Sequence, residues 1–370
     1  MTQLRLDMSP TTINRTAIYH IARDTARHLG TAAAGYRFGD NIYPHFDLSG
    51  AEESAAREKV RRKIATLLGP RSTRDRFARL LGVPRQPHRN ERPAMLLFDP
   101  LYVLFEPLDH RDIVFVLDLT TLTHPEWHNS HVALLYKTAF ERLLQSGAKI
   151  VSISSHTTAS LRANFGVSTR DIVTVPLYTR GTLLNAQPTC PSAIDQGMSF
   201  ILFVGSLETR KNVVGLVEAF DISGLAADGL HLVIAGGDAN DGQRVRDTAR
   251  TAANVHVLGF VSDGELRWLY EHAIAFAYPS YLEGFGVPII EALSFGLPVL
   301  GAMTGAIPEV VGPLAILVDP YDLTSMVDGL IRLVHEPLRQ DHMLRDQRKL
   351  HAAEYSLNKY LRALSVALEG

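Results

Sequence analysis

The chain of 370 residues is long enough for two domains of ordinary size, each with a hydrophobic core of its own. A hydrophobic content of 46% with 27 glycines is typical of α/β packing and excludes a disordered protein, whereas a formal net charge of −2 selects no class of partner. The single cysteine, Cys190, excludes a disulfide framework and favours a reducing cytoplasm. We find no pattern of a secretory signal peptide and no apolar stretch of about 18 residues that could span a membrane.

The N-terminal pattern predicts a short apolar strand at 4–8, a polar loop, and a helix over 17–29. The loop contains Asn14, Arg15 and Thr16, which could line a polar site. A plain capping loop explains the same residues, so the sequence leaves both interpretations open.

Residues 57–92 are strongly basic, with twelve Arg or Lys against three Asp or Glu and with leucines interleaved. This pattern predicts two basic amphipathic helices interrupted at Gly69 and Pro70. A solvated helical face would explain the charge. The sharper hypothesis is docking on an anionic membrane surface, where each basic residue contributes about 1 kcal/mol near the lipid. Nucleic acid is a poor alternative, because the overall charge is near neutral and no recognition motif is present.

Strands are predicted at 94–98, 101–105 and 113–117, and the last of these ends at Asp118. The loop that follows contains His124. Because α/β folds place working groups at the carboxyl ends of strands, both residues are candidates for orienting an acceptor hydroxyl or taking its proton. A helix cap at Asp118 and a surface position for His124 are the ordinary alternatives.

The first domain is predicted to close with a helix over 131–146, a strand at 149–154, a helix over 157–165 and a strand at 172–176. A segment rich in Gly and Pro, 177–199, then has the composition of an interdomain linker.

The second domain opens with a strand at 200–204, Gly205, and a helix from Val213 that is preceded by Arg210 and Lys211. A basic pair is unfavourable beside the positive end of a helix dipole, so we expect an anion to compensate it. Two cations and the helix N–H groups suit a diphosphate of charge about −2 to −3. Gly205 would allow such a ligand to approach the backbone closely.

Two further strands are predicted at 232–235 and 255–258, and the second leads into Gly259, Phe260 and Val261. The next helix is predicted to begin at a capping box of Ser262 and Glu265. A strand at 316–318 and a terminal helix over 357–368 complete the pattern.

The most specific stretch runs from Tyr278 to Gly312 and begins directly after an apolar strand at 273–278. It is predicted to form a glycine loop, a short helix that ends at Gly296, and a strand at 297–300. Glu283 precedes the loop, and Glu291 is predicted to lie in the first turn of the helix. A carboxylate beside backbone N–H donors suits polyhydroxylated ligands, because sugar and ribose hydroxyls both donate and accept hydrogen bonds.

The spacing Glu-x7-Glu, with GFGVP between the glutamates and EALSFGLPV from Glu291 onward, closely resembles the retaining glycosyltransferases of family 4. The resemblance extends over most of the chain. It implies an α/β protein of the GT-B fold, in which two Rossmann-like domains face each other across a cleft. Residues 1–180 would form the acceptor-binding domain and 195–354 the nucleotide-sugar domain, with the helix of 355–370 packing back on the first.

The resemblance also implies roles for single residues. In the second domain, Arg210 and Lys211 would hold the donor phosphates, the segment Phe260–Val261 the nucleobase, Glu283 the sugar hydroxyls and Glu291 the ribose. The donor-binding set as a whole is Gly205, Arg210, Lys211, Phe260, Val261, Glu283, Gly284, Phe285, Gly286, Val287 and Glu291.

In the first domain the resemblance is weaker. Asp118 matches a family position and, with His124 and Glu283, forms the predicted catalytic set, although Leu117 replaces a histidine that relatives often carry. Relatives also carry a glycine pair in the first loop, where this chain has Asn14, Arg15 and Thr16.

The sequence has no Asp-x-Asp motif and no Cys/His cluster with metal spacing, so we expect neither a metal nor another cofactor. The predicted reaction is transfer of a hexosyl unit with retention, most simply mannose from GDP-mannose. The acceptor would be a lipid-linked oligosaccharide or a growing polysaccharide of exopolysaccharide or O-antigen assembly, at the inner face of the cytoplasmic membrane.

Several alternatives stay open, among them a UDP- or dTDP-sugar donor and a non-catalytic protein that binds sugar nucleotides. A nicotinamide dehydrogenase is excluded, because no Gly-x-Gly-x-x-Gly turn follows a predicted strand. We find no motif for a pyridoxal phosphate lysine, and the acid pair differs from that of epimerases with this architecture, which argues against a phosphorylase and an epimerase.

Overall fold

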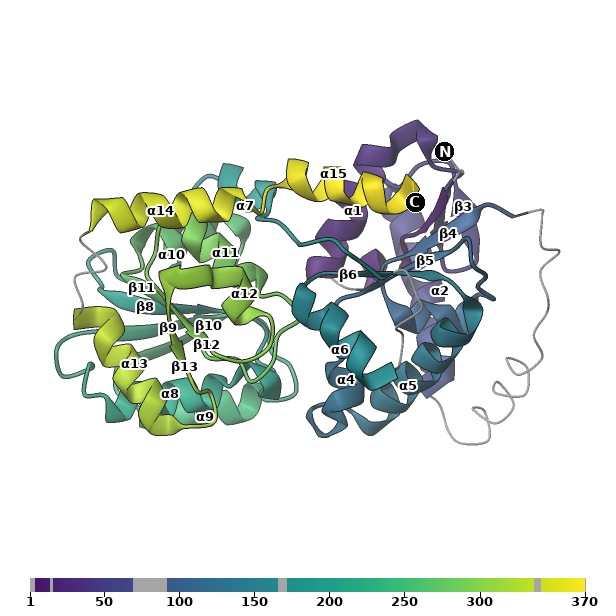
Figure 1. Cartoon of the computed structure of the whole chain (residues 1–370). Coiled ribbons are helices and arrows are strands. Elements are labelled where there is room, and N and C mark those ends of the chain that lie inside the picture. Colours follow the sequence, from purple (N-terminus) through teal and green to yellow (C-terminus); the bar gives the residue numbers. More distant parts are fainter. Residues whose placement is uncertain (1–3, 14–15, 69–91, 166–171, 336–340, 370) are drawn as a thin grey trace. The chain divides into compact units, whose positions relative to one another are not determined.

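A computed structural model describes residues 4–13, 16–68, 92–165, 172–335 and 341–369 (Figure 1). The chain divides into two compact units. The first unit comprises residues 1–153, 157–175 and 361–370, and the second comprises 154–156 and 176–360. In the described ranges no helix is both long and apolar enough to cross a membrane.

The first unit is built on a seven-stranded sheet in the order β3-β2-β1-β4-β5-β6-β7, in which only the pairing of β2 with β3 is antiparallel. The central strands are near-continuous apolar runs, because helices cover both faces of a parallel sheet. The strands are β1 (Leu4–Asp7), β2 (Tyr36–Phe38), β3 (Asn41–Tyr43), β4 (Ala94–Leu97), β5 (Ile113–Val116), β6 (Lys149–Ser152) and β7 (Ile172–Thr174).

The helices of this part of the chain include four 3-10 segments, each of which follows a strand or a helix within a few residues. They are η1 (Ser9–Thr12), α1 (Ala17–Leu29), η2 (Gly30–Ala32), α2 (Gly50–Leu68), η3 (Pro100–Phe105), α4 (Thr120–Thr123), η4 (Pro125–Trp127), α5 (Ser130–Ser146), α6 (Ser155–Phe165) and α15 (Leu357–Glu369). The end of α15 is held in the first unit by the Lys149 ammonium, which donates to the Ala367 carbonyl over 3.1 Å.

One prediction for this unit is wrong, and one hairpin was missed. The run 101–105 is the 3-10 helix η3 and not a strand, because Asp99 accepts a hydrogen bond from the Leu101 N–H and Pro100 begins a helical turn. The hairpin β2–β3 was not predicted, since each strand has only three residues. Its signal was the two-residue turn Gly39–Asp40, where Gly39 has a φ of 63°.

The basic segment 57–92 lies mostly outside the described residues, which resume at Arg92. Its beginning belongs to α2, which starts earlier than predicted, at Gly50. On α2 the guanidinium groups of Arg57 and Arg62 pair with glutamates one turn earlier, so part of the charge is neutralised within the helix.

The second unit contains a six-stranded parallel sheet in the order β10-β9-β8-β11-β12-β13. This is the strand order 3-2-1-4-5-6 of a doubly wound sheet, whose direction of winding reverses between β8 and β11. The strands are β8 (Phe200–Val204), β9 (His231–Ala235), β10 (Val255–Gly259), β11 (Ala275–Tyr278), β12 (Val299–Ala302) and β13 (Ala315–Val318).

Helices connect these strands and pack on the sheet (Figure 1). The predicted capping box is confirmed: Ser262 accepts from the Glu265 N–H, and the Glu265 carboxylate accepts from the Ser262 N–H. The helices are α7 (Gly181–Asn185), η5 (Thr209–Lys211), α8 (Val213–Ile222), α9 (Gly242–Thr251), α10 (Asp263–His272), α11 (Val287–Ser294), α12 (Ile307–Val311), η6 (Gly312–Leu314), α13 (Leu323–His335) and α14 (His342–Ala353).

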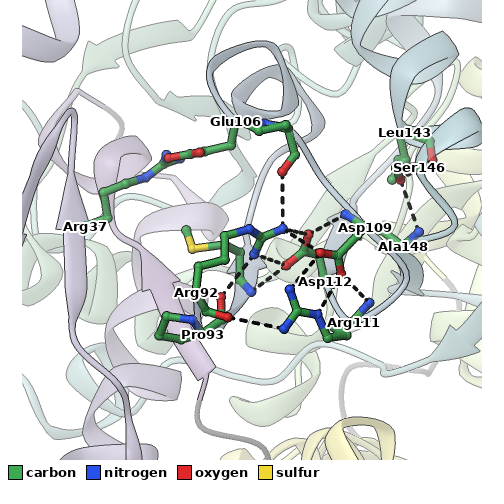
Figure 2. A network of polar contacts seen from close by, with 12 residues as sticks. Arg37, Arg92, Pro93, Glu106, Asp109, Arg111, Asp112, Leu143, Ser146 and Ala148 are labelled. Atoms are coloured by element: carbon green, nitrogen blue, oxygen red, sulfur yellow. Dashed lines mark hydrogen bonds and ion pairs between the residues drawn. The ribbon is translucent and has the colours of Figure 1, made fainter. Parts of the chain in front are cut away.

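A buried carboxylate forms several hydrogen bonds at the amino-terminal edge of the first sheet (Figure 2). Asp112 is fully buried directly before β5, and its oxygens accept from the backbone N–H groups of Met95 and Asp109, each over 2.7 Å. Arg92 donates to both oxygens of the same carboxylate, over 2.8 and 2.5 Å. This one carboxylate therefore ties β4 to the turn before β5.

We expect Asp112→Ala to lower the free energy of unfolding by about 3–5 kcal/mol, because two backbone donors lose their partner and Arg92 keeps only its longer pair with Asp109, over 3.3 Å. Urea unfolding measures this effect. Glu58→Ala is the matched control, since its pair with Arg62 is largely exposed and contributes at most about 1 kcal/mol. A loss of under 1 kcal/mol in Asp112→Ala would show that the network does not hold the strands.

Candidate functional site

The candidate site lies at the carboxyl ends of β8 and β11, where the winding of the second sheet reverses. Ligands of doubly wound folds bind at this place, because the loops after these two strands diverge. Gly205 follows β8 directly, and the loop from Pro279 to Gly286 follows β11. The structure thus brings together two of the predicted donor-binding segments, which are about seventy residues apart in the sequence.

A buried ion-pair cluster joins these two segments. Glu283 is 6% exposed, and its two oxygens accept from different cations: Oε1 from the Lys211 ammonium and Oε2 from an Arg210 nitrogen, each over 2.7 Å. Nε of Arg210 also donates to Glu208 over 2.7 Å. The positive charges of Arg210 and Lys211 are therefore balanced within the protein, by the carboxylates of Glu208 and Glu283.

The cluster fixes the charge of Glu283. Burial alone would raise the pKa of this carboxyl, but Arg210 and Lys211 outweigh burial and lower the pKa to about 2. Burial lowers the pKa of Lys211, which its pairing with Glu283 opposes. Glu283 is consequently ionised at neutral pH and unsuited to act as a general acid there.

The residues around Lys211 explain how its charged side chain can be buried. Its ammonium also donates to the Tyr278 hydroxyl over 2.5 Å. A Cβ on Gly205 would lie 3.3 Å from Cδ of Lys211, so the missing side chain leaves room for the lysine stem. Gly205 therefore serves at least to seat Lys211 beside β8.

The loop after β11 is held in place by the segment that follows β12. The Ala306 N–H donates to the Glu283 carbonyl over 3.0 Å, and a Cβ on Gly305 would lie 2.8 Å from the same carbonyl oxygen. Gly286 precedes α11 with a φ of 98°, a conformation that favours glycine. Gly284 and Phe285 are buried in this loop, and Val287 is the first residue of the helix.

Glu291 differs from the prediction. It lies in the second turn of α11 and not in the first, because the helix already begins at Val287 and Glu291 is its fifth residue. Its carboxylate is 1% exposed and accepts from Nε of Arg180 over 2.6 Å and from the Tyr270 hydroxyl over 3.1 Å. Neither partner was predicted, and Arg180 is 111 residues away in the sequence.

The predicted nucleobase segment follows β10 directly and lies in the turn before α10. Phe260 is 83% exposed, the largest exposed fraction among the large hydrophobic residues that the structure describes, and Val261 is half-buried. An exposed aromatic ring at the carboxyl edge of the sheet is available for stacking on a base.

The first unit has a row of carboxylates at the carboxyl edge of its own sheet. Asp7 ends β1, Asp99 follows β4 and Asp118 follows β5, and these three strands are neighbours. Arg37 neutralises Asp7 over 2.5 Å. In the parts of the chain described, no group of three or more His, Cys, Asp and Glu side chains could hold a metal ion.

Asp99 is a functional candidate that the sequence analysis missed, although it follows a predicted strand just as Asp118 does. Burial, together with the charges of Asp118 and Asp7, raises the pKa of Asp99 to about 6, against the hydrogen bonds from Leu101 and Tyr136, which lower it. The Tyr136 hydroxyl lies 3.0 Å from both carboxylate oxygens. Asp118 itself accepts from the N–H and hydroxyl of Thr120, the first residue of α4, whereas the N-cap residue of that helix is Leu119.

The other acceptor-side candidates are less well placed. His124 stacks on Trp127 with ring centroids 4.1 Å apart and contacts the Thr123 hydroxyl. Asn14 and Arg15 lie outside the described residues, and Thr16 is exposed directly before α1.

Comparison with known proteins identifies relatives of this architecture. Residues 191–350 match the family model of glycosyl transferases group 1. At 29% identity over 229 residues, the chain is similar to the O-antigen chain mannosyltransferase B of Escherichia coli, and the aligned segment covers 59% of this chain and 60% of that protein. At 37% identity over 117 residues, it is similar to the MMP alpha-(1->4)-mannosyltransferase of Mycolicibacterium hassiacum, over 31% of this chain and 28% of that protein. The chain therefore spans less than two thirds of the length of these relatives.

Solved structures confirm the predicted α/β class and GT-B fold. Sucrose-phosphate synthase from Thermosynechococcus elongatus superposes with a TM-score of 0.69 at 16% identity, over 100% of this chain and 98% of that one. WaaG, a glycosyltransferase involved in lipopolysaccharide biosynthesis, superposes with a TM-score of 0.66 at 14% identity, over 99% and 100% of the two chains.

We predict a pH-dependent effect of Glu283→Gln. Since the pKa of Glu283 is lowered from 4.5 to about 2 on folding, its stabilisation is complete above pH 4.5 and is lost as the pH falls from 4.5 towards 2. The variant should be less stable than the parent by about 3 kcal/mol or more at pH 7, because two buried cations lose their shared partner. Urea unfolding at several pH values should show this difference shrinking below pH 4.5.

Glu58→Gln is the control, because its exposed pair with Arg62 predicts little change at any pH. A difference between Glu283→Gln and the parent that is independent of pH would contradict the role of the ionised carboxylate.

Proposed function

Because residues 191–350 match the family model of glycosyl transferases group 1 and the chain has the GT-B fold, we propose that the protein is an enzyme that transfers a hexosyl unit from a nucleotide diphosphate sugar. The observation that carries the proposal is the cluster of Arg210, Lys211 and Glu283 at the switch point of the second sheet. It combines cations for a diphosphate with a carboxylate that can accept hydrogen bonds from sugar hydroxyls, at the place where doubly wound folds bind nucleotides.

In the reaction that we propose, the bond from the anomeric carbon to the diphosphate oxygen breaks, and the diphosphate departs with the electron pair. The acceptor hydroxyl oxygen bonds to the same face of that carbon, and its proton passes to the departing phosphate. Arg210 and Lys211 offset the negative charge that develops on the leaving group. Glu283, which stays ionised, positions the sugar hydroxyls and is not a nucleophile.

Mannose from GDP-mannose is the donor that we propose, with an acceptor that is a lipid-linked oligosaccharide or a growing polysaccharide. The support is that two relatives are named as mannosyltransferases, one of them for an O-antigen chain. A UDP- or dTDP-sugar donor is the alternative within the same reaction. We further propose that the enzyme works at the anionic inner face of the cytoplasmic membrane, where the basic segment 57–92 would contact the lipid.

A thermal-shift panel of GDP, UDP, dTDP and ADP tests the donor, with and without magnesium. A nucleotide at one hundred times its Kd stabilises the folded state by about 2.7 kcal/mol, so we expect a clear upward shift with GDP, independent of magnesium. A shift with UDP or dTDP alone would move the proposal to the alternative donors. No shift with any nucleotide would contradict the transferase proposal.

A second prediction concerns the phosphate-binding role of Arg210. We expect Arg210→Gln to weaken binding of the nucleoside diphosphate that the panel selects by about tenfold or more, because a charge-assisted hydrogen bond is lost. Binding of the corresponding nucleoside, which has no phosphate, should change little. Calorimetry with both ligands measures the two affinities.

Arg250→Gln is the matched control, because Arg250 forms an exposed pair with Asp247 on α9. An equal loss for nucleoside and nucleoside diphosphate in Arg210→Gln would show a general disturbance of the site and not a phosphate contact.

A further inference from the structure

A small cavity lies in the first unit, at the carboxyl edge of its sheet. Ser9 follows β1, Gly39 follows β2 and Tyr102 lies in η3 after β4, and these three strands are neighbours. The winding of this sheet reverses between β1 and β4, so the cavity lies at the place where doubly wound folds bind ligands. We call it the Arg37 cavity, and the residues that line it are Ser9, Arg37, Gly39, Val60, Lys63, Tyr102 and Phe105.

The lining of the Arg37 cavity is rich in hydrogen-bond donors. Among the described residues that line it none is acidic, whereas Arg37 and Lys63 are cations. The Ser9 hydroxyl accepts from the Gly39 N–H over 2.8 Å, so its own hydrogen is directed elsewhere. Burial raises the pKa of Tyr102 well above its usual value, so this hydroxyl keeps its proton and can donate. An anionic oxygen matches such a lining better than a neutral hydroxyl, because it accepts several hydrogen bonds and donates none.

Arg37 is the most firmly held of these donors. It is 4% exposed, and its terminal nitrogens are already paired, Nη2 with Asp7 over 2.5 Å and Nη1 with Glu106 (Figure 2). These two carboxylates hold the guanidinium in one orientation. Its Nε is buried as well and has no hydrogen-bond partner in the part of the chain that the structure describes. A buried donor without a partner is costly, above all in a charged group, so an oxygen atom in the cavity would stabilise it.

Lys63 reaches the same cavity from α2. Its ammonium pairs with the Asp40 carboxylate and lies 5.2 Å from the centroid of the Phe105 ring. An ammonium carries three N–H donors, so it can bind Asp40 and a ligand oxygen at once. The Lys63 side chain is 25% exposed, so a ligand that arrives from solvent meets Lys63 before the buried Arg37.

We propose that the Arg37 cavity binds one oxygen of an anionic group of the acceptor, a phosphate or a carboxylate, with Arg37, Lys63 and Tyr102 as donors. The cavity volume of about 10 Å³ is close to the space that one water molecule needs, so the sugar rings of the acceptor would lie outside it. The assignment to the acceptor rests on the proposed function, whereas the anion site lies wholly in the first unit and does not depend on it. The inference narrows the acceptor to a saccharide that carries an oxyanion.

An NMR titration of the full chain with inorganic phosphate tests the anion site. The amide signal of Gly39 reports on the cavity directly, because this N–H donates to the Ser9 hydroxyl in the cavity wall. We expect the signal to shift in a saturable manner with phosphate, and not with chloride at the same ionic strength. Acetate is titrated in parallel, and saturable binding of either oxyanion supports the proposal. The stronger of the two responses shows whether the acceptor carries a phosphate or an acidic sugar.

Two conservative variants locate the bound anion. Lys63→Gln and Tyr102→Phe should each weaken oxyanion binding about tenfold, as expected when a hydrogen bond to a charged group is lost. Lys59→Gln is the matched control and should change the affinity little. Lys59 is exposed one turn earlier on α2, donates to Asn41 over 3.1 Å and does not line the cavity. The melting temperature shows whether each variant is folded.

Mannose 1-phosphate and glucuronic acid test the assignment to the acceptor. If the cavity serves a saccharide, contacts with the sugar ring should make mannose 1-phosphate bind more tightly than inorganic phosphate, or glucuronic acid more tightly than acetate. Equal affinities in both comparisons would overturn the assignment to the acceptor.

The outcomes separate this inference from the proposed function. If no nucleotide stabilises the protein but the Gly39 signal responds to an oxyanion, the proposed function fails, the anion site stands and its assignment to the acceptor falls. If the signal responds to phosphate and acetate no more than to chloride, the cavity holds only water and the inference is overturned. Folded Lys63→Gln and Tyr102→Phe variants that both keep the affinity of the parent would overturn it as well.

Discussion

The interaction on which the second unit depends is the sharing of one buried carboxylate, Glu283, by Arg210 and Lys211. Removing three charges from water is costly, and the cost is offset only if each charge faces an opposite one with good geometry. Here the opposite charges come from the segments that follow β8 and β11, two neighbouring strands. The ion pairs can form only when β8 and β11 lie side by side in the sheet. The sheet therefore places the three charges, and their ion pairs in turn hold the two segments that follow the strands together.

This constraint explains the positions of several residues without polar groups. Gly205 leaves room for the Lys211 stem, and Gly305 lets the connection after β12 approach the Glu283 carbonyl. A side chain at either position would press on a member of the ion-pair cluster. The glycines of this stretch therefore serve the placement of charges inside the protein, in addition to any contact between backbone and ligand.

The sequence predicts the second unit well, because its strand–loop–helix pattern is carried by continuous apolar runs that end at Gly and Pro. The sequence is a poorer guide where contacts between distant residues determine the local structure. The apolar run 101–105 has the composition of a strand, yet the Asp99 side chain and Pro100 start a helical turn. Glu291 was placed one turn too early because the sequence does not show that the helix already begins at Val287, which makes Glu291 its fifth residue. Arg180 could not be found at all, since its partners lie 83 and 111 residues further along the chain.

The carboxyl edges of the two sheets carry acids of opposite electrostatic character, although both are parallel sheets. In the second unit, paired cations lower the pKa of Glu283 to about 2, which leaves a permanent charge suited to orienting hydroxyls. In the first unit, Asp99 faces the Tyr136 hydroxyl and the charge of Asp118, and burial raises its pKa to about 6. An acid of that pKa exchanges its proton near neutral pH, as Glu283 cannot. The same fold, used twice in one chain, thus provides one edge that fixes charge and another that can change it.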